Sequence, residues 1–179
     1  MGTIQKNSDW EKLTAVQKGN LGEDIVQRLL ENKNYIVLRP TAEKPHWFDM
    51  FVMSDKSRPA QNIDQFVAEV KSKPYMFKYN ATGVNYRNFE EYWQYYNKTG
   101  TRIFLFFVDE IRAEIYGNYL DILEKPSTVK GVSYPFNLEC KGGRIIRLYS
   151  LENMVILAKL KAETAAQLKE LSRRNYEYK

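Results

Sequence analysis

The sequence predicts an α/β fold in which a central mixed β-sheet is flanked by helices on both faces. Two segments, around residues 15–32 and 89–98, carry apolar side chains at helical spacing. Short segments rich in β-branched and aromatic residues lie between and after them. One of these, residues 103–108 (IFLFFV), is apolar at every position. Such a strand is covered on both of its faces, so helices are expected on both sides of the sheet.

The first helix is expected to begin after Thr14, where Thr14-Ala15-Val16-Gln17 resembles a capping box, and to run to about residue 32. Three strands are expected next, at residues 35–39, 47–53 and 65–71. The last two are separated by SDKSRPAQN, a polar stretch with a proline that indicates a loop.

The second helix has an apolar stripe of aromatic residues and is expected to stop at Thr99-Gly100. Phe89, Tyr92, Trp93 and Tyr96 form this stripe. Further elements are then expected in this order: strands at 103–108 and 113–116, a helical turn at 119–123, a hairpin of 134–139 with 144–149, and a final helix from about Ser150 to Arg174. We predict a single domain over residues 1–179, with a core at about 15–108 and the C-terminal hairpin and helix, about 131–175, as an appended element.

The composition is that of a globular protein, with 44% hydrophobic and 27% charged residues. No apolar run approaches the roughly 18 residues of a membrane span, and the N-terminus lacks a secretory h-region, so we expect a cytoplasmic protein without a membrane partner. One cysteine, Cys140, and one histidine, His46, cannot build a zinc site. The net charge of +5 leans mildly toward polyanionic partners.

Two charges follow the apolar interior of the strand FVAEVKSK. Glu69 and Lys71 are two residues apart, so their side chains share one face. The same Glu-x-Lys spacing occurs without a preceding apolar strand at Glu31–Lys33, Glu139–Lys141 and Glu177–Lys179. The preceding strand, WFDMFVM, contains Asp49. Two carboxylates on neighbouring strands repel each other unless a cation lies between them, and Mg²⁺ takes oxygen ligands of this kind.

The order of these residues resembles the PD-(D/E)XK nuclease superfamily, which has the restriction-endonuclease-like fold. Glu23, in Gly22-Glu23, matches the acid of the first helix, Asp49 the strand aspartate, and Glu69 with Lys71 the last motif. The run GNLGEDIVQRLL resembles the Holliday-junction-resolvase branch. The resemblance covers about residues 15–108, and Phe48 stands where the family often has proline.

The resemblance implies an enzyme, a Mg²⁺-dependent nuclease that hydrolyses phosphodiester bonds of DNA, with Mn²⁺ able to substitute. Asp49, Glu69 and the backbone carbonyl of Val70 would hold the metal, Lys71 would act on the attacking water, and Glu23 would assist. Because no recognition domain is evident, we expect structure-directed or weakly sequence-specific cleavage. A homodimer is left open.

Each of these residues also has a purely structural interpretation. Glu23 could belong to a helix start capped by Asn20, although Gly22 lies in the apolar arc and would let the helix approach the sheet. Asp49 could face solvent on an edge strand, and Glu69 with Lys71 could form a surface ion pair.

Basic and aromatic residues alternate after Lys71, and we expect Lys73, Lys78 and Arg87 to contact nucleic acid. Arg87 could instead pair with Glu91 at i, i+4. Two further functions stay open, namely a catalytically inactive nucleic-acid-binding or assembly domain of this fold and a protein-binding scaffold.

Overall fold

The computed structural model describes residues 14–40, 48–54 and 65–177, with side chains to residue 173. His46, Trp47 and most of the predicted loop after Ser54 lie outside these residues. None of the described helices combines the length and the apolar character needed to cross a bilayer.

The main sheet has six strands in the order β1-β2-β3-β5-β6-β11. Its strands are β1 (Tyr35–Leu38), β2 (Met50–Ser54), β3 (Gln65–Ser72), β5 (Arg102–Asp109), β6 (Glu114–Tyr119) and β11 (Val155–Lys159). β3 and β5 are parallel, whereas the other neighbours are antiparallel. The sheet is therefore mixed, as predicted.

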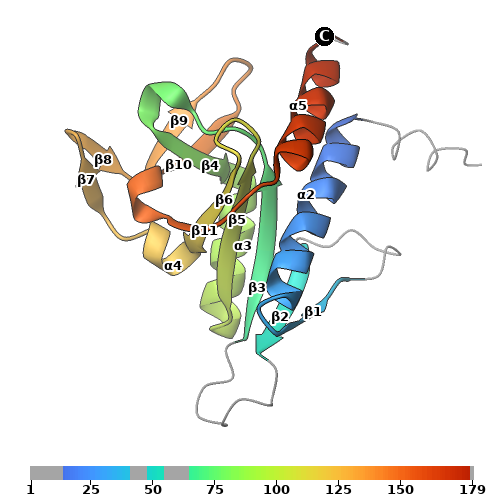
Figure 1. The fold of residues 1–179 in the computed structure, drawn as a ribbon. Helices are drawn as coiled ribbons and strands as arrows, with labels where there is room; N and C mark the ends of the chain where they lie inside the picture. The colour runs from blue at the N-terminus through green and yellow to red at the C-terminus, as the bar shows by residue number, and fades with distance from the viewer. Residues whose placement is uncertain (1–13, 41–47, 55–64, 178–179) are drawn as a thin grey trace, which may run out of the picture.

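Helices cover both faces of this sheet (Figure 1). On one face, α2 (Thr14–Glu31) and α5 (Ala162–Glu177) contribute to a core with Val70 and Phe106. On the other, α3 (Tyr86–Thr99) packs its aromatic stripe against Leu105 and Phe107. The predicted fold class is confirmed, and Gly100, in the left-handed region, ends α3 where Thr99-Gly100 predicted it.

A smaller sheet stands beside the main one, in the order β4-β10-β9. Its strands are β4 (Ala81–Asn85), β9 (Phe136–Glu139) and β10 (Ile145–Ser150). The predicted hairpin is present as β9 and β10. β4 was not predicted, and neither was the hairpin of β7 (Ser127–Val129) and β8 (Val132–Tyr134). The short elements are η1 (Phe77–Tyr79), α4 (Leu120–Leu123) and η2 (Leu151–Asn153).

The predicted helix from Ser150 to Arg174 is wrong in nearly its first half. The chain forms η2 and then β11 before α5 begins at Ala162. β11 pairs with the edge of β6, where its backbone finds partners and its β-branched Val155 and Ile156 are favoured. α5 then packs against α2. The division into core and appended element stays a prediction.

The start of β2 also differs from the prediction. The expected strand 47–53 begins at Met50 instead, so Asp49 lies just before the strand rather than inside it. This position frees the Asp49 side chain from the alternation of the strand.

Gly22 brings α2 close to β3. A Cβ added at Gly22 would lie 1.7 Å from Ser72 Oγ and 3.1 Å from Ser72 Cβ. The predicted close approach of helix and sheet at Gly22 is confirmed, and it places Glu23 beside the end of β3.

Candidate active site

Asp49 lies beside Glu69, directly before the start of β2. Met50 pairs with Ala68, and the Asp49 N–H also donates to the Ala68 carbonyl, at 3.2 Å, so the regular pairing of β2 with β3 stops at Met50. The Asp49 side chain turns to β3, where its Oδ2 accepts the backbone N–H of Val70 at 2.7 Å. The Asp49 carboxylate is therefore held at the residue after Glu69, close enough for its charge to raise the pKa of Glu69.

Glu69 is only 4% exposed, and its two carboxylate oxygens differ in their hydrogen-bond partners. Oε1 accepts from both Lys71 Nζ and the hydroxyl of Tyr92, the latter at 2.6 Å. Oε2 is buried and has no hydrogen-bond partner among the described residues. Lys71 thus shares the face of Glu69 as predicted, and one acidic oxygen is left without a donor.

The electrostatics of the site follow from burial and from the second carboxylate. The pKa of Glu69 is raised to about 7, chiefly by burial; the charge of Lys71 acts to lower this pKa and the charge of Asp49 acts to raise it. Burial also raises the pKa of Asp49, against the hydrogen bond from Val70 and the charge of Lys71. For Lys71, burial acts to lower the pKa, but Glu69, Asp49 and Glu23 outweigh it and raise the pKa. In the absence of a bound cation, the site holds more negative charge than its surroundings stabilise.

Glu23 lies near enough to Asp49 and Lys71 to feel their charges. Burial, followed by the charge of Asp49, raises its pKa to about 7. Among the described residues it forms no hydrogen bond or ion pair with Asp49, Glu69 or Lys71. Because α2 begins at Thr14, Glu23 stands in the middle of the helix. The interpretation of Glu23 as part of a capped helix start is therefore wrong.

The donor set fits a hard divalent cation such as Mg²⁺. Both backbone groups of a strand residue point toward the same neighbouring strand, so the Val70 carbonyl points to the side of Asp49, beyond the last pair of β2. The available ligands are therefore all oxygen atoms: the Val70 carbonyl oxygen, the Asp49 carboxylate and the unpartnered Oε2 of Glu69. The described residues contain no group of three or more His, Cys, Asp or Glu side chains arranged to hold a metal. Mg²⁺ commonly uses only one or two carboxylates and keeps several waters.

The three residues expected to contact nucleic acid differ in their surroundings. Lys73 donates to the Gly83 carbonyl, and burial, with the charges of Lys71 and Arg144, lowers its pKa to about 8. Lys78 is exposed, with Nζ 5.2 Å from the centre of the Tyr79 ring.

Arg87 is also exposed. Arg87 pairs with Glu91 at 3.5 Å, so the alternative prediction of an i, i+4 ion pair is confirmed. Of these three residues, only Lys73 lies near Lys71, whose charge acts on it.

Tyr92 was expected only as a core aromatic residue. It is 1% exposed and does pack in the core, but its hydroxyl also holds Glu69. A buried tyrosine hydroxyl needs a polar partner, so a tyrosine within an apolar helical stripe was the available signal.

Comparisons with known proteins find similar solved structures, among them a Holliday junction resolvase. No family model and no curated protein matches the sequence. The Holliday junction resolvase Hjc of Archaeoglobus fulgidus is similar in structure, with a TM-score of 0.44 and 11% sequence identity over 82% of this chain and 97% of the resolvase chain.

Proposed function

We propose that this chain is a metal-dependent nuclease that hydrolyses phosphodiester bonds of DNA. The observation that carries the proposal is the arrangement of Asp49 and Glu69, two neighbouring carboxylates of which one has a buried oxygen without a partner among the described residues, while Lys71 binds the other oxygen of Glu69. A purely structural site would gain nothing from two neighbouring carboxylates, because like charges repel each other.

Each residue has a separate role in the proposal. Asp49, Glu69 and the Val70 carbonyl would hold Mg²⁺, or Mn²⁺ in its place. The ion supplies an activated water and neutralises charge that develops on the phosphate. Lys71 orients the attacking water and adds positive charge beside the phosphate.

Two further residues support this group. Tyr92 keeps the Glu69 carboxylate in position through its hydroxyl. Glu23 would act from α2 on the water shell of the ion.

We propose further that cleavage is structure-directed or only weakly sequence-specific. The catalytic motif supports hydrolysis of a phosphodiester bond but indicates no preferred DNA sequence. Cleavage of sequence-randomised DNA should give products spread over many positions. A single fixed cleavage site in that experiment would overturn this part of the proposal.

The direct test is cleavage of labelled linear duplex, single-stranded and four-way-junction DNA with Mg²⁺ or Mn²⁺. We expect wild type to cut, and Asp49→Ala and Lys71→Ala to lose cutting. Asp24→Asn is the matched control, because Asp24 is an exposed acid on α2 that pairs with Arg39. If wild type binds DNA without cutting it under any metal, the chain is a binding domain and the nuclease proposal is wrong.

A further inference from the structure

A groove of about 440 Å³ begins at Lys71 and runs away from the carboxylates. It lies between the end of β3, the strand β4, the start of α3 and the beginning of β10. The polar residues that line it are Lys71, Lys73, Thr82, Asn85, Asn88 and Arg144. The C-terminal hairpin thus contributes a residue next to the candidate active site.

The charge of this groove is one-sided. Lys71, Lys73 and Arg144 line it, and none of the described acidic residues does. Glu69 offsets Lys71, whereas Lys73 has only the neutral Gly83 carbonyl as an acceptor. Neither Lys73 nor Arg144 forms an ion pair within the part of the chain that the structure describes. Two positive charges therefore stand close together without an anion.

Neutral hydrogen-bond donors beside these charges also favour an anionic ligand. Thr82 lines the groove and is 1% exposed, and its Oγ1 has no partner among the described residues. An unpaired buried hydroxyl costs about 1–3 kcal/mol, so a ligand that pairs with it gains affinity. The N-terminus of α3 also opens here, with Asn85 as its N-cap and no acidic residue in its first turn. Helix N-termini favour anions.

We propose that this groove binds a second phosphate group of the substrate strand, adjacent to the one that is cut. Arg144 and Lys73 supply charge, and Thr82 and Asn88 supply hydrogen-bond donors. The inference rests on the proposed function for its substrate, but the groove itself requires no catalysis. The phosphate is either an internal phosphodiester or a terminal phosphate monoester.

The test measures binding of a labelled oligonucleotide to the full chain in EDTA, where no cutting occurs. Arg144→Gln should weaken binding about tenfold and reduce the slope of log affinity against log salt by about 1. The control is Lys141→Gln, which removes an exposed charge from the same hairpin but outside the groove. Equal effects of Arg144→Gln and Lys141→Gln would overturn the proposal.

A second variant tests the groove without a change of charge. Thr82→Val keeps the shape of the side chain and removes only the unpartnered hydroxyl. We expect binding about threefold weaker, at a melting temperature equal to or above that of wild type, because the unpaired buried hydroxyl is removed. Full affinity in Thr82→Val would remove the threonine from the proposed site and contradict it.

The source of the phosphate is distinguished with oligonucleotides that carry a 5′-phosphate, a 3′-phosphate or neither. An Arg144→Gln effect confined to one phosphorylated end identifies a terminal phosphate, and an equal effect on all three identifies an internal one. The same variants are then assayed for cleavage with Mg²⁺. If wild type never cuts DNA but its binding still depends on Arg144, the nuclease proposal is wrong and the groove proposal stands. If wild type cuts DNA and Arg144→Gln affects cutting no more than Lys141→Gln does, the groove proposal is wrong and the nuclease proposal stands.

Discussion

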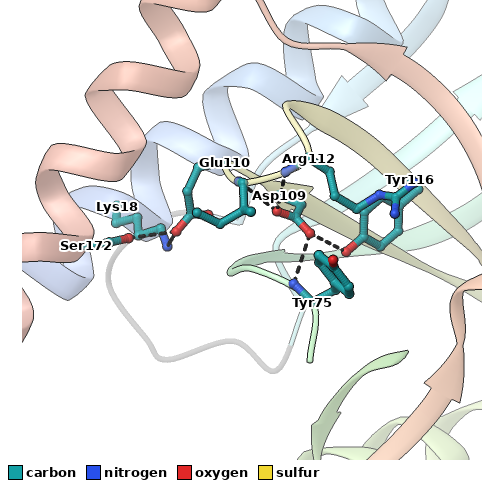
Figure 2. Close-up of polar contacts among 8 residues, drawn as sticks. Lys18, Tyr75, Asp109, Glu110, Arg112, Tyr116 and Ser172 are labelled. Atoms are coloured by element: carbon teal, nitrogen blue, oxygen red, sulfur yellow. Dashed lines mark hydrogen bonds and ion pairs between the residues drawn. The ribbon is translucent and has the colours of Figure 1, made fainter. Parts of the chain in front are cut away.

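Two groups of buried acids stand at the ends of neighbouring strands, and they differ in how they are satisfied. Asp109, at the end of β5, is fully buried. Its Oδ1 accepts the backbone N–H groups of Ile111 and Arg112 at 2.8 and 3.0 Å. Its Oδ2 accepts from the Tyr75 N–H and the Tyr116 hydroxyl, both at 2.9 Å (Figure 2). Four donors thus hold one carboxylate.

The neighbouring Glu110 connects three parts of the chain. Its Oε1 accepts from Lys18 of α2 at 2.7 Å and from Ser172 of α5 at 2.8 Å (Figure 2). Glu110 Oε2, like Glu69 Oε2, is buried without a partner among the described residues. A single unpaired oxygen therefore does not distinguish a site.

The distinguishing feature is the second carboxylate. Glu110 binds an ammonium and a hydroxyl, whereas Glu69 has Asp49 as well as Lys71 near it. Burial of an acid with enough donors stabilises a fold, but two neighbouring acids require a cation to do so. We infer that the Asp109–Glu110 group is structural and the Asp49–Glu69 group is functional, and this contrast can be tested.

The largest expected effect is on cleavage. Asp49→Asn and Glu69→Gln should each reduce metal-dependent cutting about a thousandfold or more, because they remove charge that would hold the ion. Their melting temperatures in EDTA should be equal to or above that of wild type, because repulsion is relieved. Cutting at the wild-type rate by either variant would place the functional acids elsewhere.

The second effect is on stability and concerns Asp109. Asp109→Ala leaves three backbone N–H groups and the Tyr116 hydroxyl without an acceptor, so we expect a loss of about 3 kcal/mol in denaturant unfolding. The control, Asp24→Ala, breaks an exposed pair and should cost within about 0.5 kcal/mol. If Asp109→Ala were as stable as Asp24→Ala, Asp109 would not be structural.

The third effect is a dependence of stability on pH. The pKa of Glu69 is about 7 in the folded protein against a usual value of 4.5, so the folded state binds more protons between these values. Glu69 should therefore contribute a loss of about 2 kcal/mol of stability to the metal-free protein as the pH rises from about 5 to 7. Glu23, whose pKa is also raised to about 7, adds to this dependence, so Glu69→Gln should reduce its slope in unfolding curves measured across that range. A wild-type curve that rises with pH over the same range would contradict the assignment.

The smallest effects come from two glycines of α2. Gly22→Ala meets Ser72 and should cost about 1–2 kcal/mol, because helix and sheet must separate slightly. Gly19→Ala finds nothing within 4 Å and should stabilise the same helix by about 0.5–1 kcal/mol. Thermal unfolding compares the two directly. Effects of the same sign would show that Gly22 is not a contact point.

Much of the fold could be predicted because its elements have strong local patterns. The period of α2, the aromatic stripe of α3 and the apolar β5 each identify their element without tertiary information. β4, with the sequence ATGVN, lacks such a pattern and is a strand only because β10 pairs with it. β11 was assigned to a helix because its exposed Val155 and Ile156 gave no alternation, and an edge pairing decided its structure.

The contacts of the candidate site likewise fall into those that local sequence patterns predict and those that depend on tertiary packing. The shared face of Glu69 and Lys71 follows from the period of a strand, and the meeting of Asp49 with Glu69 follows from adjacent strands. The role of Tyr92 depends on how α3 packs against the sheet, which sequence spacing does not give. Arg144, just before β10, reaches the groove from far along the chain, and no local pattern indicates that contact.

The most direct test of the central claim is calorimetric titration of Mn²⁺ into metal-free protein above pH 7. Wild type and Asp109→Asn, if the latter remains folded by circular dichroism, should each bind an ion, whereas Asp49→Asn should show binding too weak to fit. Equal binding by wild type and Asp49→Asn, or no binding by wild type, would contradict the assignment of Asp49 and Glu69 as the residues that hold a divalent cation.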